Sequence, residues 1–501
     1  MITRRVIDST VLLLCIAGIF LVHRISVQVF DTLPHLEDEY AYVWQAKAAT
    51  RMQLSVASPP CPTCFLAPFV VDHEGVRSGK YPPAWPVMLS LGERFHGRDW
   101  VNPILAGISL WLAYLLFAKF LPRPLAAIGT ILLVSSPFFL LNASSLLSHV
   151  WSLFLTLSFI HLWFDFTEQR LHLSPPLTAV LVGCLLGLLI LTRPLTALAI
   201  SLPFVVHAWI LFLRQKTLRS SLVIVAGTSL VFVGLFLVWQ FAVTGSPFTN
   251  PYTLWWPYDK LGFGPGTGVT PEGHSLANAW HNFKTSFRAG RSDLFGWGIF
   301  SWIFMPLGFF ALRKDRKALL IAGLIPSLIL AYGFYWIGSE LYGPRYYFEA
   351  LIPAALLTVG GVQFLASRLA ELIGKKTSPA VQFAMLILIL APLVGYNLVR
   401  YLPDRLASMK AELKENRSQL APFTMPDFTA KTPALIIVHQ VQNWREDGVL
   451  TELQNPFLDT PFIFIYSRQP EDDAAVIAAF PERSVWHYYA DEPKTLYSSL
   501  R

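Results

Sequence analysis

Apolar runs long enough to cross a lipid bilayer recur along this sequence and leave few folds open to it. A transmembrane helix needs about 20 predominantly apolar residues, because the hydrocarbon layer is about 30 Å thick. Hydrophobic residues make up 54% of the chain and charged residues only 14%, which excludes an ordinary soluble protein. The chain is therefore predicted to be an α-helical polytopic membrane protein. We expect eleven spans, near residues 10–30, 100–118, 125–141, 147–164, 176–192, 195–213, 221–243, 294–312, 318–337, 347–367 and 380–399.

The basic residues of the short loops predict how these spans are oriented. Arg4 and Arg5 lie at the N-terminus, and every second loop after them is basic. Short basic loops stay in the cytoplasm, so we expect a cytoplasmic N-terminus and, with eleven spans, an external C-terminus. These loops account for most of the net charge of +7, which therefore indicates no nucleic-acid partner. The basic loop residues are Lys119 and Arg123; Arg170; Arg214, Lys216 and Arg219; Arg313, Lys314, Arg316 and Lys317; and Arg368, Lys375 and Lys376.

Three carboxylates stand where the first apolar run ends, in the stretch Glu37-Asp38-Glu39-Tyr40. Carboxylates are costly beside a membrane unless they are solvated, paired or used, so the cluster is a candidate site. The alternative is that Asp38 is the N-cap of the helix that follows, with Glu39 favouring the positive end of its dipole.

The first external loop, residues 31–99, is far longer than a connection requires. Its Cys61 and Cys64 lie on the external side, where they form either a local disulfide or two free thiols. No second C-x-x-C pair completes a tetrahedral metal site. A hairpin turning at Glu74-Gly75 is expected next.

Lys80 follows this hairpin and precedes Tyr81-Pro82-Pro83, a stiff entry into the membrane that fixes the direction of the lysine. The alternative is an interfacial lysine that extends its ammonium group to water. Arg193 and Arg345 also stand on the external face, against the positive-inside trend, and an arginine held there requires an anion such as a phosphate.

The long external loop 244–293 is rich in aromatic and glycine residues. Its Trp255 and Trp256 suit sugar stacking or a lid, although an interfacial aromatic belt has a similar composition. His149 begins a span and is either a site residue or a polar helix end.

The composition changes after residue 400. A polar surface helix is expected over residues 401–420 and another helix near 471–480. Strands are expected at 434–438, 461–466 and 484–489, so residues 401–501 are predicted to form a small external α/β domain. It has no nucleophile elbow, phosphate loop or metal-ligand spacing, and we assign it no chemistry.

The external motifs resemble those of the GT-C membrane glycosyltransferases, the group that contains protein O-mannosyltransferases, the lipid A aminoarabinose transferase and RgtA-like sugar transferases. The resemblance covers about residues 1–400, and the order and common sidedness of the motifs carry it. It implies a GT-C-like bundle of about eleven transmembrane helices. The motifs are Asp38-Glu39-x-x-Tyr42, Lys80-Tyr81-Pro82-Pro83, Leu191-Thr192-Arg193-Pro194 and Arg345-Tyr346.

The resemblance implies an enzyme that moves a hexosyl or pentosyl group from a polyprenyl-phosphate carrier to an external lipid, glycan or protein acceptor of the cell envelope. The family's first-loop acid falls on Asp38, with Glu39 beside it. Some relatives hold a metal through an acidic residue before the lysine; that position is Gly79 here, so a divalent metal is not supported. The donor-phosphate residues fall on Lys80, Arg193, Arg345 and Tyr346, and the sugar- or acceptor-binding candidates are Tyr42, Tyr81, His149, Trp255 and Trp256.

The chemistry is consistent with this site. Displacing a phosphate from an anomeric carbon requires a base for the attacking hydroxyl, whereas the leaving phosphate is already a stable anion. One carboxylate and a basic cradle therefore suffice, with Asp38 as the base.

The chain lacks a long inserted lumenal domain, which points to a bacterial inner membrane. The competing class is a lipid-linked sugar flippase, which typically binds near the bilayer midplane between repeated halves; a non-catalytic scaffold would leave the ordered charges unexplained.

Overall fold

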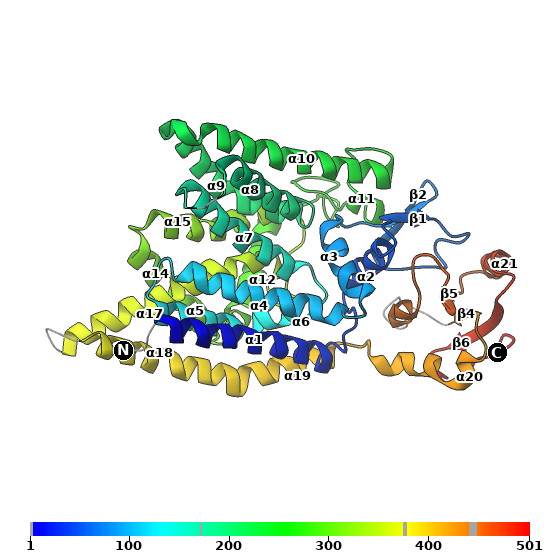
Figure 1. The fold of residues 1–501 in the computed structure, drawn as a ribbon. Helices are drawn as coiled ribbons and strands as arrows, with labels where there is room; N and C mark the ends of the chain where they lie inside the picture. The colour runs from blue at the N-terminus through cyan, green and yellow to red at the C-terminus, as the bar shows by residue number, and fades with distance from the viewer. Residues whose placement is uncertain (1–3, 171–172, 374–377, 440–447) are drawn as a thin grey trace.

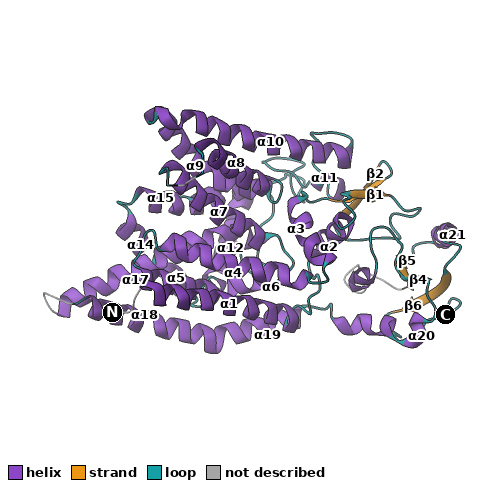
Figure 2. Ribbon diagram, viewed as in Figure 1, coloured by secondary structure: helices purple, strands orange, loops and turns teal. Residues whose placement is uncertain are grey.

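The computed structural model describes residues 4–170, 173–373, 378–439 and 448–501. Long helices run side by side in one bundle, and the two chain termini lie at opposite ends of the molecule (Figure 1). Figure 2 shows the strands of the described residues gathered at the end that carries the C-terminus. The bundle thus has one purely helical end and one end built from loops and two small sheets.

The first half of the chain supplies the site loop and the central helices of the bundle. A small three-stranded sheet interrupts the run of helices early in the chain. In order the elements are α1 (Arg4–Gln28), α2 (Glu37–Ala49), β1 (Ser55–Ala57), β2 (Val70–His73), β3 (Val76–Gly79), α3 (Ala84–Arg94), α4 (Arg98–Phe117), α5 (Arg123–Val134), α6 (Pro137–Ser144), α7 (His149–Thr167), α8 (Pro175–Ile190), α9 (Pro194–Arg214), η1 (Lys216–Leu218) and α10 (Arg219–Thr244).

The second half adds outer helices and the C-terminal sheet. They are α11 (Tyr252–Trp255), α12 (Leu276–Asp293), α13 (Phe300–Ile303), α14 (Met305–Leu312), α15 (Arg316–Ala322), α16 (Leu324–Gly333), η2 (Arg345–Ala350), α17 (Leu351–Ile373), α18 (Pro379–Tyr396), η3 (Asn397–Tyr401), α19 (Leu402–Glu412), η4 (Arg417–Thr424), α20 (Pro426–Thr429), β4 (Ala434–His439), η5 (Gly448–Leu453), β5 (Phe462–Tyr466), α21 (Pro470–Ala479) and β6 (Ser484–Tyr489).

Each of the eleven apolar runs falls on helix. Against the eleven expected spans, eight helices among the described residues are long and apolar enough to cross a membrane, or nine if α5 and α6, which are bent by 58° at their junction, count as one broken span. The runs near 176–192 and 294–312 correspond to the shorter apolar helices Pro175–Ile190 and Phe300–Leu312. The protein is therefore a multi-pass membrane protein. Lys375 and Lys376, used to predict its orientation, lie outside the described residues.

The expected hairpin and C-terminal strands are present. β2 and β3 pair antiparallel across Glu74 and Gly75, which both have positive φ as a tight two-residue turn requires, and β1 adds a third strand. β4 pairs in parallel with β5 and β6 in the order β5-β4-β6. The polar helix expected over residues 401–420 ends earlier: α19 stops at Glu412, and η4 begins at Arg417.

Cys61 and Cys64 form a disulfide, which settles the alternative left open by the sequence. Both half-cystines are buried against the C-terminal sheet with Leu435, Ile463 and Val476. The loop that carries this disulfide therefore contributes to the core of the C-terminal region.

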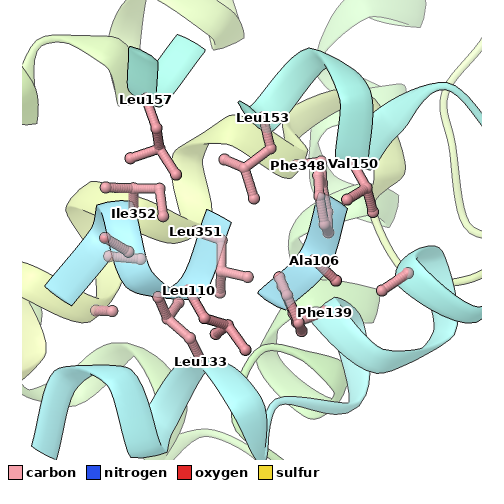
Figure 3. Packing of buried hydrophobic residues seen from close by; sticks show 14 of the residues in the cluster. Ala106, Leu110, Leu133, Phe139, Val150, Leu153, Leu157, Phe348, Leu351 and Ile352 are labelled. Carbon is pink, nitrogen blue, oxygen red and sulfur yellow. The ribbon is translucent and has the colours of Figure 1, made fainter. Parts of the chain in front are cut away.

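The apolar core of the bundle lies directly beneath its loop-bearing end. Figure 3 shows Phe348 and Val150 packed with leucines of α4, α7 and α17. Phe348 follows Arg345 by one turn, and Val150 follows His149, so these polar side chains stand at the edge of a close-packed core. Their backbone positions are fixed by that packing.

Candidate functional site

The acidic cluster begins α2, but Asp38 is not its N-cap. Leu36 occupies that position, and Asp38 is the second helical residue. Glu39 satisfies the helix start instead: its carboxylate accepts hydrogen bonds from the backbone N–H groups of Leu36 (3.0 Å), His35 (2.8 Å) and Leu146 (2.8 Å). The alternative reading of Asp38 as a cap is corrected, and its carboxylate is left available for other partners.

Glu39 is fully buried, at 0% exposure, with both oxygens engaged by backbone donors. Burial raises the pKa of its carboxyl, while the neighbouring His35 and the three N–H donors oppose this shift. Its geometry suits holding the loop before α2 and the Leu146 turn together. Glu39 thus fixes the start of the helix that carries Asp38.

Asp38 forms the centre of the site with Arg345 and Tyr81. One carboxylate oxygen lies 3.2 Å from Nη2 of Arg345, and the other accepts a hydrogen bond from the Tyr81 hydroxyl. Nε and Nη1 of Arg345 are buried and have no hydrogen-bond partner among the described residues. A buried guanidinium with two unused donors is suited to binding an anion, because unpaired buried donors are costly. Burial, and then the charge of Asp38, raise the pKa of Tyr81, so it stays a donor.

Lys80 has a counterion that the sequence did not reveal. Its Nζ lies 3.3 Å from Oδ2 of Asp259, and both side chains are about 98% buried. Tyr335 and Trp336 donate hydrogen bonds to the other Asp259 oxygen at 2.9 and 3.0 Å. Burial lowers the pKa of Lys80, and Asp259 and Asp38 oppose that shift. The ammonium group is therefore held by the loop 244–293.

Four aromatic rings enclose the Lys80 ammonium. Its Nζ lies 3.4 Å from the ring centre of Phe69 and 4.9 Å from those of Tyr252 and Trp256. Tyr81 is the fourth ring, at 5.4 Å. The cage excludes the alternative of a lysine extended to water. Cation–π attraction to desolvated rings adds to the ion pair.

Arg193 pairs with a second carboxylate that sequence reasoning missed. Its Nη1 lies 3.2 Å from Oε1 of Glu349, which also accepts a hydrogen bond from Ser152. Its Nη2 donates to the Tyr332 hydroxyl at 3.1 Å. Tyr346 stacks on Tyr332 with ring centres 4.9 Å apart. Arg193 is therefore paired with Glu349 and Tyr332, and the stacked rings of Tyr332 and Tyr346 connect it to the residue that follows Arg345.

The remaining candidates surround this centre. Tyr42 lies against Tyr81, with ring centres 4.6 Å apart, and its hydroxyl contacts the Ser148 hydroxyl at 3.2 Å. Burial, and then the charge of Asp38, raise the pKa of Tyr42, whereas Arg193 and Arg345 oppose that shift. His149 is buried, and neither ring nitrogen has a partner among the described residues, so it is not a solvated helix end.

The two tryptophans lie on the side of the site that carries Lys80. Trp255 and Trp256 both pack edge-on against Phe69, with ring centres 5.6 and 5.1 Å apart. Trp256 also stacks on Tyr258. Trp256 is therefore part of the lysine cage, and Trp255 packs against the Phe69 ring of that cage.

The three bases expected to share one phosphate pocket are brought to one end of the bundle, but each has its own carboxylate. The pairs are Lys80 with Asp259, Arg193 with Glu349, and Arg345 with Asp38. Of the three, Arg345 keeps unused donors. One signal pointed to Glu349: a carboxylate at the start of a membrane span requires a partner. Asp259 had no such signal, because it lies in a loop without periodicity.

The position expected to hold a metal ligand in some relatives does not fit one here. A side chain on Gly79 would begin 2.4 Å from the side chain of Gln45, which donates a hydrogen bond to the Tyr81 carbonyl at 2.8 Å. Among the described residues, the one His, Cys, Asp or Glu group with metal-ligand spacing is Cys61, Cys64 and Asp472, and its cysteines are joined.

Solved structures resemble this chain over most of its length. ArnT from Cupriavidus metallidurans bound to undecaprenyl phosphate matches with a TM-score of 0.57 and 13% identity, over 96% of this chain and 90% of ArnT. Its apo form matches with a TM-score of 0.55 and 14% identity, over 94% and 88%. The archaeal oligosaccharyltransferase AglB from Archaeoglobus fulgidus, in complex with an inhibitory peptide and a dolichol-phosphate, matches with a TM-score of 0.51 and 12% identity, over 94% and 69%. No protein-family model and no curated protein sequence matches the chain.

These matches define the class of fold. The chain has the fold of the GT-C membrane glycosyltransferases, a helical membrane bundle with a small sheet-containing C-terminal region. The resemblance indicated by its short motifs is confirmed at this level.

Proposed function

We propose that this protein is a glycosyltransferase that moves a sugar from a polyprenyl-phosphate carrier to a cell-envelope acceptor at the external face of a bacterial inner membrane. The observation that supports it most is the Asp38–Arg345 pair, at 3.2 Å, in which the guanidinium retains two unused donors. A base and an anion-binding group then lie in direct contact. The acceptor is a lipid, glycan or protein hydroxyl.

In the proposed step, the acceptor oxygen forms a bond to the anomeric carbon of the donor while the bond from that carbon to the phosphate oxygen breaks. Asp38 takes the proton of the attacking hydroxyl. Both electrons of the broken bond leave with the phosphate, whose charge is bound by Nε and Nη1 of Arg345. Tyr81 donates to Asp38 and orients its carboxylate.

The neighbouring structures support the carrier. One ArnT structure holds undecaprenyl phosphate, and one AglB structure holds a dolichol-phosphate. The flippase considered from the sequence is less consistent with the site, because the ion pairs gather at one end of the bundle rather than near its middle.

The proposal is tested with the purified protein in liposomes. A panel of undecaprenyl-phosphate hexoses and pentoses is added with a cell-envelope extract, and free undecaprenyl phosphate is quantified by mass spectrometry. We expect its release with at least one donor, since every sugar leaves the same carrier. Movement of intact donor between leaflets without release would favour the flippase.

Arg345→Lys is expected to weaken undecaprenyl-phosphate binding by about 10- to 100-fold, or about 1.5–3 kcal/mol for a charged hydrogen bond. Lysine keeps the charge but lacks the fork that serves Asp38 and a phosphate together. Binding is measured by titration in detergent. Arg291→Lys, an exposed change on α12, is the control and should bind normally. Equal binding by both variants would contradict the role of Arg345.

The proposed orientation gives a separate prediction. An epitope tag after Arg501 should react with a membrane-impermeant reagent in spheroplasts, whereas a tag inserted beside Arg316 should react only after the membrane is broken. The reason is that short basic loops are retained in the cytoplasm. Reaction at Arg316 in intact spheroplasts would contradict the orientation.

A further inference from the structure

Hydrogen bonds from the C-terminal region hold the segment that precedes α2. His35 is buried, and its Nε2 lies 2.8 Å from the Phe30 carbonyl while its Nδ1 lies 3.2 Å from the Glu415 carboxylate. A carbonyl and an ionised carboxylate both accept, so this arrangement favours the imidazolium, in which each ring nitrogen carries a proton. Arg417 donates to the Asp31 carbonyl at 2.9 Å. The loop before Asp38 is therefore held from residues 415–417.

The far end of α2 is held by a different part of the same region. Lys47 donates to the carbonyls of Thr451 (3.1 Å), Glu452 (2.9 Å) and Gln454 (3.0 Å). All three ammonium protons are thus used, and the carbonyls lie at the C-terminal end of η5. A cation at this end is favoured by the helix dipole. Lys47 therefore attaches the C-terminal end of α2 to η5.

Arg98 connects the two attachments, the one before α2 and the one at η5. Arg98, at the start of α4, donates to the Glu452 carboxylate at 2.7 Å and to the Thr32 carbonyl at 3.1 Å, and it also pairs with Glu93. Burial alone raises the pKa of Glu452, but Arg98 and Lys47 lower it overall. This buried network connects η5, the loop before α2 and the membrane helix α4.

From this geometry we infer that the C-terminal region is a positioning element of the proposed transfer site, which holds Asp38 through Glu415 on His35 and through η5 on Lys47. The inference rests on the proposed function. None of these residues contacts Asp38; they fix both ends of the 13-residue helix that carries it. The site depends on that placement, because a shift of about 1 Å in a catalytic group costs on the order of a hundredfold in rate.

The variants are Lys47→Met and Glu415→Gln in the full chain. Arg51→Gln is the matched control: Arg51 lies two residues after α2 and also pairs with the C-terminal region, through Asp459 at 2.7 Å, but both side chains are about half exposed. Exposed ion pairs contribute little. We expect kcat for undecaprenyl-phosphate release to fall about 10- to 100-fold in both variants with KM within about threefold, and to stay within about twofold in Arg51→Gln.

The pH profile separates positioning from general damage. The charged groups acting on His35 are Glu39 of α2 and Glu415; burial lowers the pKa of its imidazole, but these carboxylates raise it overall above 6.5. A raised pKa means that the contact is complete below 6.5 and is lost as the pH rises through the raised value. The alkaline decline of kcat should therefore move to lower pH in Glu415→Gln and remain in place in Arg51→Gln.

Hydrogen exchange supplies a readout that does not depend on turnover. Amides of Glu37–Ala49 should exchange faster in Lys47→Met than in wild type or Arg51→Gln. Unchanged exchange in Lys47→Met, or the same alkaline decline in wild type and Glu415→Gln, would overturn the inference. Altered exchange in a protein that releases no carrier from any donor would instead retain the attachment and reject the proposed function.

Discussion

Asp38→Asn is expected to fold, insert and bind undecaprenyl phosphate, yet to transfer sugar at least about a hundredfold more slowly than wild type. A general base contributes about 10²- to 10⁴-fold, and an amide does not take a proton from a hydroxyl. The amide oxygen of the substituted side chain can still accept from Arg345, and its NH2 group can donate to the Tyr81 hydroxyl in place of the second carboxylate oxygen. The helix start is unaffected, because Glu39 rather than Asp38 satisfies its backbone N–H groups. Single-turnover release of undecaprenyl phosphate measures the effect.

The control is Glu74→Gln, the same chemical change at an exposed turn tip of the same loop, residues 31–99. It should retain normal transfer. Near-normal turnover in a well-folded Asp38→Asn protein would remove Asp38 from the mechanism. Activity would then have to depend on another carboxylate near the Arg345 guanidinium.

Lys80→Met should destabilise the protein by about 3–5 kcal/mol, the usual cost of removing one partner from a buried ion pair. The variant leaves the Asp259 carboxylate about 98% buried with its Tyr335 and Trp336 donors but no cation. Unfolding is followed by denaturant titration in detergent. The substitution is thus expected to disturb the loop 244–293, which holds Asp259, in addition to any contact between Lys80 and a donor.

The double variant Lys80→Met with Asp259→Asn should recover a large part of the lost stability, because the uncompensated charge is gone. Lys260→Met is the control at the adjacent exposed position, with a change within about 0.5 kcal/mol. Equal losses in the single and double variants would show that the pair is not the stabilising unit.

Local patterns predicted much of the architecture. Among the described residues, apolar run length located every helix that can cross a membrane, since the thickness of the bilayer fixes the length that a span requires. Alternation and turn residues likewise located the hairpin at Glu74-Gly75 and the C-terminal strands. Run length did not show that the span near 125–141 bends by 58° between α5 and α6, where Ser136 caps α6.

By itself, then, the sequence determined the membrane bundle and the set of charged motifs that gather at one end of it. Only the tertiary structure decided their partners: Asp259 for Lys80, Glu349 for Arg193, and Asp38 for Arg345. It also decided that Glu39 rather than Asp38 holds the helix start. The physical reason is range. Hydropathy and capping act within one element, whereas a buried charge selects its counterion from residues more than a hundred positions away, once the chain has folded around both.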